Sequence, residues 1–366
     1  MIMKKILFIV PLPPPVHGHS LMCKYVLESD FLCNGYEYDV VNLHTSRTME
    51  EMGKKPVLKF FRFVKAYIRT LCLLIRHRYD FCYIAITCHG SGFLKDMPFA
   101  LLCKVFCKKV VYHQHNQGVR FDMDRIPYKW LYPWVYKNSK VILLSWNLYS
   151  DISRYVPREH VYICPNGIPS VETHHYIKPN IRVPGILFLS NLLIEKGIFV
   201  LLDALNMLHA NGVVFKCDII GSETSEVDKS ILQSYIIKKG LQDSVHYYGP
   251  AYGNDKEKFF NDADVFVLPS LNECFPLVLL EAMQHSIVCV ASNEGAIPDI
   301  IRDGETGYIF EKGNASQLCE RLQELCGNYT LLKEMGKAGY SYFEDQLTLK
   351  RFESNLCKIF SKIVNE

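Results

Sequence analysis

Two glutamates separated by seven residues mark the segment of this sequence with the strongest chemical signal. Glu273 lies in a loop after an apolar run, and Glu281 lies one to two turns into the helix expected from Pro276. Proline suits the first turn of a helix, because its missing N–H would have no intrahelical partner there. Free amides and the helix dipole favour an anion at such a start, above all a phosphate. The segment therefore predicts a phosphate site with two carboxylates close to it.

The elements that must position these residues alternate short apolar runs with longer helical stretches along both halves of the chain. This alternation predicts an α/β protein with parallel sheets of the doubly wound type, which bind ligands at the carboxyl ends of their strands. We expect strands at 5–10, 38–43, 81–87, 109–113, 141–145 and 161–164, and again at 185–190, 215–221, 244–248, 265–269 and 288–292.

The length of 366 residues predicts two domains, at roughly 100–200 residues each. We expect an N-terminal Rossmann-like domain over 1–175, a C-terminal Rossmann-like domain over 176–345, and a helix over 346–366 that packs back on the first domain. An aperiodic polar stretch over 170–184 indicates the linker. Two such domains would face one another across a central cleft.

The composition excludes several classes of protein. With 49% hydrophobic and 22% charged residues, the chain is not disordered. No apolar run approaches the ~20 residues that span a bilayer, and the apolar start before Pro11 indicates a buried strand rather than a signal peptide. The 14 cysteines include no Cys-x-x-Cys pair and no zinc-like set, which favours reduced structural thiols in a cytosolic protein.

Charge is divided unevenly within a formal net charge of +3. The first half carries an excess of Lys and Arg, and the second half an excess of Asp and Glu. Lys59, Arg62, Lys65 and Arg69 recur at helical spacing with aromatic and aliphatic residues between them. This pattern suits a helix at an anionic membrane surface, and equally a core-packing helix with a solvated basic face. No nucleic-acid-binding module is evident, so we expect no nucleic-acid partner.

The two glutamates and their surroundings resemble a known family. Glu273 and Glu281 resemble the Glu-x7-Glu signature of glycosyltransferase family 4, the retaining group 1 glycosyltransferases of bacterial cell-surface polysaccharide synthesis, which have the GT-B fold. The resemblance is nearly continuous in the second half and patchy in the first. It implies that the domain over 1–175 binds the acceptor and that the domain over 176–345 binds the nucleotide sugar. Further segments that resemble the family are Pro165–Ile168, Leu189–Gly197, Val245–Pro250 and Gly295–Gly307.

The resemblance implies a role for each matching residue. Glu281 would accept hydrogen bonds from the nucleotide ribose, and Glu273 would contact hydroxyls of the transferred sugar. Lys196 would neutralise the pyrophosphate as the nucleotide leaves. Asn191 occupies the position at which the family usually has Arg. Because asparagine is neutral, this position adds no positive charge beside the pyrophosphate. The implied donor-binding set is Gly18, Asn191, Lys196, Glu273, Cys274, Phe275, Pro276, Leu277 and Glu281.

The first half matches at two places. Gly18 lies where the family has a Gly-rich loop, although the family's first glycine is His17 here. A proline-rich ligand for an SH3-type domain is the rival interpretation of residues 11–15. The family also has a histidine near the sugar, and we assign it to His115, with His113 as the alternative.

These implications lead to one expected function. We expect a metal-independent hexosyltransferase without a cofactor, in which Glu273, Lys196 and His115 are catalytic. The donor would be a nucleotide sugar, with UDP favoured and GDP possible, and the acceptor a hydroxyl of a glycan or lipid-linked glycan. The protein would be cytoplasmic and peripheral on the inner face of the cell membrane. A non-catalytic sugar-nucleotide-binding subunit and a GT-B epimerase stay open as alternatives.

Two other chemistries fit the sequence less well. Asp122-x-Asp124 and Asp262-x-Asp264 only superficially match the metal-binding Asp-x-Asp motif of GT-A glycosyltransferases. No Gly-x-Gly-x-x-Gly follows the first strand of either domain, which argues against a dehydrogenase.

Overall fold

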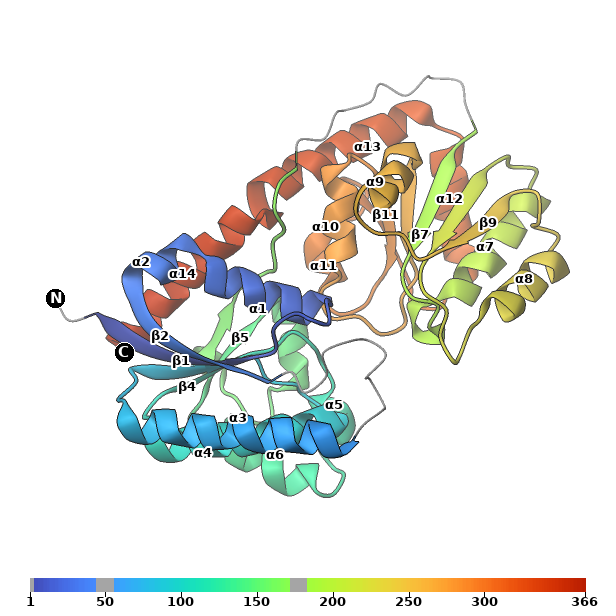
Figure 1. The fold of residues 1–366 in the computed structure, drawn as a ribbon. Helices are drawn as coiled ribbons and strands as arrows, with labels where there is room; N and C mark the ends of the chain where they lie inside the picture. Colours follow the sequence, from blue (N-terminus) through green and yellow to red (C-terminus); the bar gives the residue numbers. More distant parts are fainter. Residues whose placement is uncertain (1–2, 44–55, 172–182) are drawn as a thin grey trace. The chain divides into compact units, whose positions relative to one another are not determined.

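Two six-stranded parallel sheets organise the chain, one in each of two units (Figure 1). This computed structural model describes residues 3–43, 56–171 and 183–366. Unit 1 comprises residues 1–166 together with 349–366, and unit 2 comprises residues 167–348. The chain therefore changes unit at 166/167 and 348/349, whereas the sequence places the changes at 175/176 and 345/346. Most of the linker expected at 170–184 lies outside the described residues.

Unit 1 has the strand order β2-β1-β3-β4-β5-β6. Its strands are β1 (Lys4–Val10), β2 (Tyr36–Asn42), β3 (Phe81–Ile84), β4 (Val110–His113), β5 (Lys140–Leu143) and β6 (Val161–Ile163). Its α-helices are α1 (Gly18–Glu28), α2 (Asp30–Gly35), α3 (Pro56–Arg76), α4 (Gly90–Phe106), α5 (Val119–Asp122), α6 (Tyr128–Tyr136) and α14 (Leu349–Asn365). Helices α1, α2 and α14 cover one face of the sheet, and α3, α4 and α6 cover the other (Figure 1).

The helix α14 completes the core of unit 1. Phe360 is fully buried, and its ring contacts five other aromatic rings of this unit. Those rings belong to Phe8, Phe31, Tyr36, Phe81 and Tyr83. Lys109 also donates a hydrogen bond to the backbone oxygen of Ile363 at 2.9 Å. The end of the described chain is thus a structural part of the unit that contains its beginning.

Unit 2 has the strand order β12-β11-β10-β7-β8-β9. Its strands are β7 (Gly185–Leu189), β8 (Lys216–Ile220), β9 (Val245–Gly249), β10 (Val265–Leu268), β11 (Val288–Ser292) and β12 (Gly307–Phe310). Its α-helices are α7 (Ile198–Ala210), α8 (Lys229–Lys238), α9 (Gly253–Asp262), α10 (Leu277–Gln284), α11 (Ile297–Ile300), α12 (Ala315–Cys326) and α13 (Tyr329–Tyr342). β12 has no counterpart among the strands expected from the sequence.

Both sheets are parallel, and their central strands are buried on both faces. All four residues of β3, β4 and β10 are buried, which explains their continuous apolar character. The strand order reverses beside β1 in unit 1 and beside β7 in unit 2. In a doubly wound sheet, such a reversal opens a crevice at the carboxyl ends of the strands, where ligands bind. In unit 2 the order reverses between β7 and β10, so the loops that follow these two strands are where a ligand is expected.

The 14 cysteines, all of which lie in the described residues, form no disulfide. No helix in the described ranges is long and apolar enough to cross a membrane.

Candidate functional site

The loop between β10 and α10 carries the first of the two glutamates. It runs from Pro269 to Pro276, and Pro276 lies at the N-cap, one residue before the first helical residue. The segment that contains Gly295 and Ala296 holds this loop in place. The amide of Ala296 donates to the oxygen of Cys274 at 2.8 Å. Gly295 has a φ of +55°, and a Cβ there would lie 2.1 Å from the backbone oxygen of Glu273. Glycine therefore allows the close approach that holds this loop in place.

A second loop, between β7 and α7, brings Lys196 to the same place. Gly197 follows it with a φ of +76°, and a Cβ at this glycine would lie 1.8 Å from the oxygen of Pro269. The amide of Leu271 donates to the oxygen of Glu195 at 2.7 Å. The two loops are thus joined by backbone contacts that only a glycine at position 197 permits.

Lys196 and Glu273 form an ion pair across these loops. Lys196 Nζ lies 2.6 Å from Glu273 Oε2, and the two side chains are only 21% and 15% exposed. The hydroxyl of Ser270 also donates to Glu273 Oε2, at 3.4 Å. Because β7 and β10 are adjacent parallel strands, the pair lies at the point where the strand order reverses. This is the position at which a doubly wound sheet receives a ligand.

Glu281 lies in the second turn of α10 and forms an ion pair with a different lysine. Its Oε1 is 2.8 Å from Nζ of Lys256, which belongs to α9. One turn further on, Nε2 of His285 contacts Glu257 Oε2 at 2.7 Å. Sequence reasoning missed Lys256, because no motif marks it and 25 residues separate it from Glu281. The two glutamates of the Glu-x7-Glu motif are therefore each paired with a separate cation.

The other donor-site residues of unit 2 predicted from the sequence differ in how deeply they are buried. Phe275 and Pro276 are buried, whereas Cys274 and Leu277 are half-buried. Asn191 is exposed, and its backbone oxygen accepts the amide of Leu193 at 2.8 Å. The buried residues anchor the start of α10, and the amide side chain of Asn191 faces solvent without adding positive charge.

In unit 1, Gly18 is the first residue of α1 and is exposed. His17 caps this helix: its Nδ1 accepts the amide of Ser20 at 3.2 Å, and Ser20 Oγ accepts the amide of His17 at 3.1 Å. This reciprocal pair is a capping box, with histidine in the place of the usual serine or threonine. The histidine thus fixes the start of α1 at a position where the family has glycine.

The two histidines at the end of β4 differ in their environment. His113 is fully buried, and its Nδ1 lies 2.5 Å from the hydroxyl of Tyr83. Burial and the nearby His19 lower the pKa of His113 to about 3. His115 is half-buried, and both its ring nitrogens are enclosed without a hydrogen-bond partner among the described residues. Burial, then His113, lower the pKa of His115 as well. Both rings are therefore neutral near pH 7.

Helix α3 carries the four basic residues that the sequence singles out. Lys65 and Arg69 are exposed, and Lys59 and Arg62 are half-buried. The helix contains no acidic residue. One side of α3 packs on α4, where Phe63 and Tyr67 contact the ring of Phe99. The other side mixes cations with exposed apolar residues. The exposed apolar residues of α3 are Val57, Leu58, Phe60, Phe61, Ile68 and Ile75.

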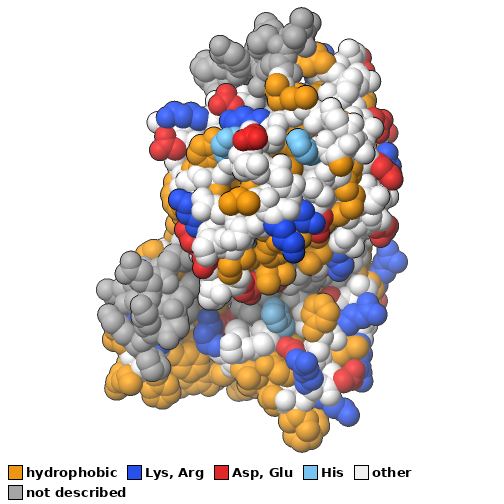
Figure 2. All heavy atoms as spheres, turned by 90° about the vertical axis from the view of Figure 1, so that its right-hand side faces the viewer, with side chains coloured by type: hydrophobic (Ala, Val, Ile, Leu, Met, Phe, Trp, Pro, Cys, Tyr) orange, Lys and Arg blue, Asp and Glu red, His pale blue; other side chains and the backbone are white. Residues whose placement is uncertain are grey.

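A second group of exposed apolar side chains in unit 1 lies on and before α6. Trp130 is 61% exposed and Trp134 is 71% exposed, and both belong to this helix. Phe121 and Ile126 in the preceding segment are also exposed. Figure 2 shows hydrophobic side chains gathered along its lower edge with basic ones between them. Sequence reasoning missed this second group, although two tryptophans four residues apart are a recognisable signal.

Three carboxylates of the two Asp-x-Asp segments have structural partners. Asp122 accepts the amide of Gly90 at 2.9 Å, whereas Asp124 pairs with Arg154 at 2.8 Å. Asp264 accepts the amide of Gly185 at 2.8 Å. Their carboxylates therefore hold separate parts of the fold.

The comparison with protein families identifies most of unit 2. Residues 178–342 match the model of the family described as "Glycosyl transferases group 1". Residues 178–342 are therefore similar to the group 1 glycosyltransferases. This segment contains both loops of the Lys196–Glu273 pair and the whole of α9 and α10.

Curated relatives are similar to about half of this chain. The amylovoran biosynthesis glycosyltransferase AmsK of Erwinia amylovora is 27% identical over 203 residues, 53% of this chain and 49% of its own. The capsular polysaccharide biosynthesis glycosyltransferase CapM of Staphylococcus aureus is 25% identical over 49% of this chain and 46% of its own. The chain thus spans about half the length of these relatives.

Solved structures match the fold over nearly the whole chain. A glycosyltransferase from Rickettsia africae gives a TM-score of 0.75 at 16% identity and covers 99% of both chains. Anabaena Alr3699/HepE in complex with UDP and glucose gives a TM-score of 0.72 at 15% identity, over 98% of this chain and 100% of its own. At these identities the likeness establishes the fold, which is GT-B, as the sequence predicts.

Proposed function

We propose that this protein is a retaining glycosyltransferase that moves a hexose-type sugar from a nucleotide diphosphate sugar to a hydroxyl of a glycan or lipid-linked glycan. The observation that carries the proposal is the Lys196–Glu273 ion pair at the crevice of unit 2. It places a cation and a carboxylate beside the start of α10, where free amides favour a phosphate. Relatives named for amylovoran and capsule synthesis support a role in surface polysaccharide biosynthesis.

The residues of unit 2 would divide the work between the parts of the donor. Lys196 and the amides at the start of α10 would hold the diphosphate and stabilise its charge as it leaves. Glu273 would accept hydrogen bonds from sugar hydroxyls, and Glu281 from the ribose. The bond from the anomeric carbon to the distal phosphate oxygen breaks, and a bond to the acceptor oxygen forms. The acceptor proton passes to the leaving phosphate oxygen, so no protein base is required.

The pairing of the two glutamates argues for transfer on one face of the sugar. A retaining glycosidase places two carboxyl groups about 5–5.5 Å apart and uses one as the nucleophile. Here Glu273 and Glu281 each hold a different lysine, at 2.6 and 2.8 Å. An ion-paired carboxylate is a weak nucleophile. We therefore propose that the acceptor attacks from the side on which the nucleotide leaves.

The donor that we propose is a UDP-sugar, with a GDP-sugar as the second choice. The support is the UDP and glucose in the complex of the structurally similar HepE. We expect donor binding to be independent of metal, with Lys196 and the amides of α10 taking the place of a cation. His115 in unit 1 is our candidate for the histidine near the sugar.

We further propose that unit 1 associates with an anionic membrane on the cytoplasmic side, where a lipid-linked acceptor would be found. Two observations support this proposal. Helix α3 presents Lys65 and Arg69 among exposed apolar residues and has no acidic residue to oppose them. Helix α6 adds Trp130 and Trp134, and tryptophan favours the boundary between headgroups and acyl chains.

Donor turnover tests the transferase proposal. The wild type, Lys196→Ala and Glu281→Ala would be incubated with UDP-, GDP- and ADP-sugars, and sugar release and nucleotide binding measured. Slow release of one sugar, lost in both variants, supports the proposal and names the donor. Conversion of the sugar without release would indicate an epimerase. Binding without turnover on any acceptor would indicate a binding subunit, and binding of no nucleotide would overturn the assignment to sugar transfer.

Vesicle binding tests the membrane proposal separately. Lys65→Gln with Arg69→Gln should weaken retention on anionic vesicles at low salt about 30-fold, since each cation contributes about 1 kcal/mol. Trp130→Ser with Trp134→Ser should weaken it at low and high salt alike. The matched control is Val214→Ser, which alters an exposed apolar residue of unit 2. Equal retention of all variants, or no retention of the wild type, would contradict the proposal.

A further inference from the structure

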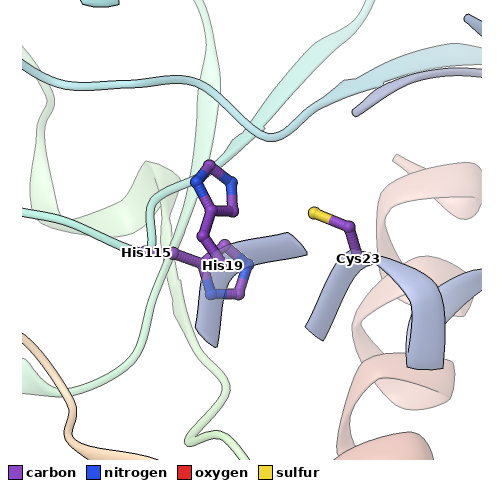
Figure 3. Close-up of side chains that lie close together, drawn as sticks. All are labelled: His19, Cys23 and His115. Atoms are coloured by element: carbon purple, nitrogen blue, oxygen red, sulfur yellow. The ribbon is translucent and has the colours of Figure 1, made fainter. Parts of the chain in front are cut away.

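Three side chains whose atoms could act as metal ligands cluster in unit 1. His19 and Cys23 stand four residues apart on α1, so they share one face of the helix. His115 comes from the segment that follows β4. The ligand atoms of these three side chains all lie within 4.8 Å of one another. Figure 3 shows the two imidazole rings together, with the sulfur of Cys23 directed toward them.

The surroundings hold the three groups in place. Cys23 is fully buried. The rings of His19 and His115 stack, with their centroids 4.8 Å apart and their planes at 28°. The ring centroids of His113 and His115 lie 4.1 Å apart, and His113 also forms a hydrogen bond with the hydroxyl of Tyr83. The cluster is therefore built on a helix and on the segment directly after a buried strand.

The polar atoms of His115 point to a ligand. Both its ring nitrogens are enclosed, and within the described residues neither has a hydrogen-bond partner. A buried polar atom without a partner costs about 1–3 kcal/mol, so such atoms call for an explanation. No carboxylate belongs to the cluster. A cation coordinated by His115 would satisfy one of these nitrogens.

The donor set matches a thiophilic cation. Two imidazoles and one thiolate are ligands that zinc accepts, at about 2.0–2.1 Å for nitrogen and about 2.3 Å for sulfur. Around a tetrahedral ion these lengths place the ligand atoms about 3.4–3.6 Å apart. The ligand atoms here lie at most 4.8 Å apart. Side-chain rotations that move these atoms by about 1 Å would bring them to the separations that a tetrahedral ion needs. A fourth position would remain for water.

We propose that His19, Cys23 and His115 bind one divalent cation of the zinc class. Binding replaces the S–H bond of Cys23 by a metal–sulfur bond and releases one proton to the solvent, without oxidation or reduction. The bound cation would tie the first turns of α1 to the segment after β4. The proposal shares His115 with the proposed transferase site, but it is tested by metal binding alone and does not depend on glycosyl transfer.

Direct metal titration tests the proposal. The purified, metal-free protein would be titrated with Zn²⁺ against a chromogenic chelator, and with Co²⁺ while its visible and near-ultraviolet absorption is recorded. We expect one equivalent of each metal to bind, with a thiolate-to-cobalt band in the wild type. Cys23→Ala should abolish this band, and His115→Gln should weaken zinc binding at least about tenfold. Mg²⁺ should not compete, because it prefers oxygen ligands.

Controls separate this site from adventitious binding. Cys33→Ala and Cys72→Ala remove thiols that are exposed in the same unit, and they should leave zinc binding unchanged. If Cys23→Ala does not fold, as judged by circular dichroism, His19→Gln takes its place. Failure of the wild type to bind zinc overturns the proposal. Equal binding by wild type, Cys23→Ala and His115→Gln would show an adventitious ion only, and also overturns it.

Discussion

Replacing Lys196 by Met should separate the structural and the chemical contributions of the Lys196–Glu273 pair. At 2.6 Å and an effective dielectric constant of about 20, the attraction of two unit charges is about 6 kcal/mol before desolvation is subtracted. Removing one partner of a buried pair costs about 3–5 kcal/mol. Because these side chains are 21% and 15% exposed, we expect Lys196→Met to lose about 2–3 kcal/mol of unfolding free energy.

The double variant Lys196→Met with Glu273→Gln removes both charges. It should regain stability to within about 1 kcal/mol of the wild type, because no charge is left uncompensated. It should not regain activity. Loss of one preorganised group that stabilises developing charge costs about 10²–10³ in kcat, and we expect this loss in the single and the double variant alike.

Urea unfolding and donor turnover, measured on the same preparations, make the comparison. The matched control is Lys312→Met, because Lys312 and Glu294 form an ion pair of the same 2.6 Å length in unit 2. Lys312 is 46% exposed, so its loss should cost no more than about 1 kcal/mol and leave turnover unchanged. Turnover that recovers together with stability in the double variant would refute a chemical role for Lys196.

Three further predictions use other features of the two units. Glu281→Gln should weaken nucleotide binding about tenfold in calorimetry, because the ribose loses a charged acceptor; unchanged affinity would place the ribose elsewhere. Gly197→Ala should lower the unfolding free energy measured in urea by about 3 kcal/mol or more. The reason is that φ at this residue is +76° and the new Cβ would collide with the backbone oxygen of Pro269. An unchanged unfolding free energy would contradict the described loop contact. Burial lowers the pKa of Lys104 to about 8, so its charge opposes folding below pH 8 and this penalty fades as the pH rises toward 10.5. The stability of Lys104→Met relative to the wild type should therefore fall between pH 8 and 10.5, and a difference independent of pH would be inconsistent with that cost.

The strands were largely predictable from the sequence, because their residues are buried on both faces and read as apolar runs. The run 288–292 coincides with β11. The expected strand at 81–87 is longer than β3, which ends at Ile84. There the amides of Thr87 and Cys88 bond to the side chains of Asp96 and Asn116 instead of a neighbouring strand. β12 was missed because it is short and begins in a segment rich in Gly and Thr.

The contacts of the candidate site were less predictable than its members. The family resemblance supplied Lys196 and Glu273, but spacing alone does not show that residues 77 positions apart form an ion pair. Lys256 has no motif that would mark it. His19 and Cys23 have a helical spacing suited to metal ligands, but His115 joins them only because the sheet topology brings the end of β4 beside α1. Local sequence patterns therefore identified the helices and strands, whereas the order of the strands in each sheet decided which side chains come into contact.

The packing of α14 on unit 1 means that this unit cannot complete its core until residues 349–366 have been made. Domains generally fold as they emerge from the ribosome, beginning with the N-terminal one. Here all of unit 2 emerges before residues 349–366, which include Phe360 of the unit 1 core. Unit 2 can therefore complete its core first, although unit 1 begins first. Until α14 is made, the rings of Phe8 and Phe81 lack their contact with Phe360, so the aromatic face that α14 covers in the folded protein stays open.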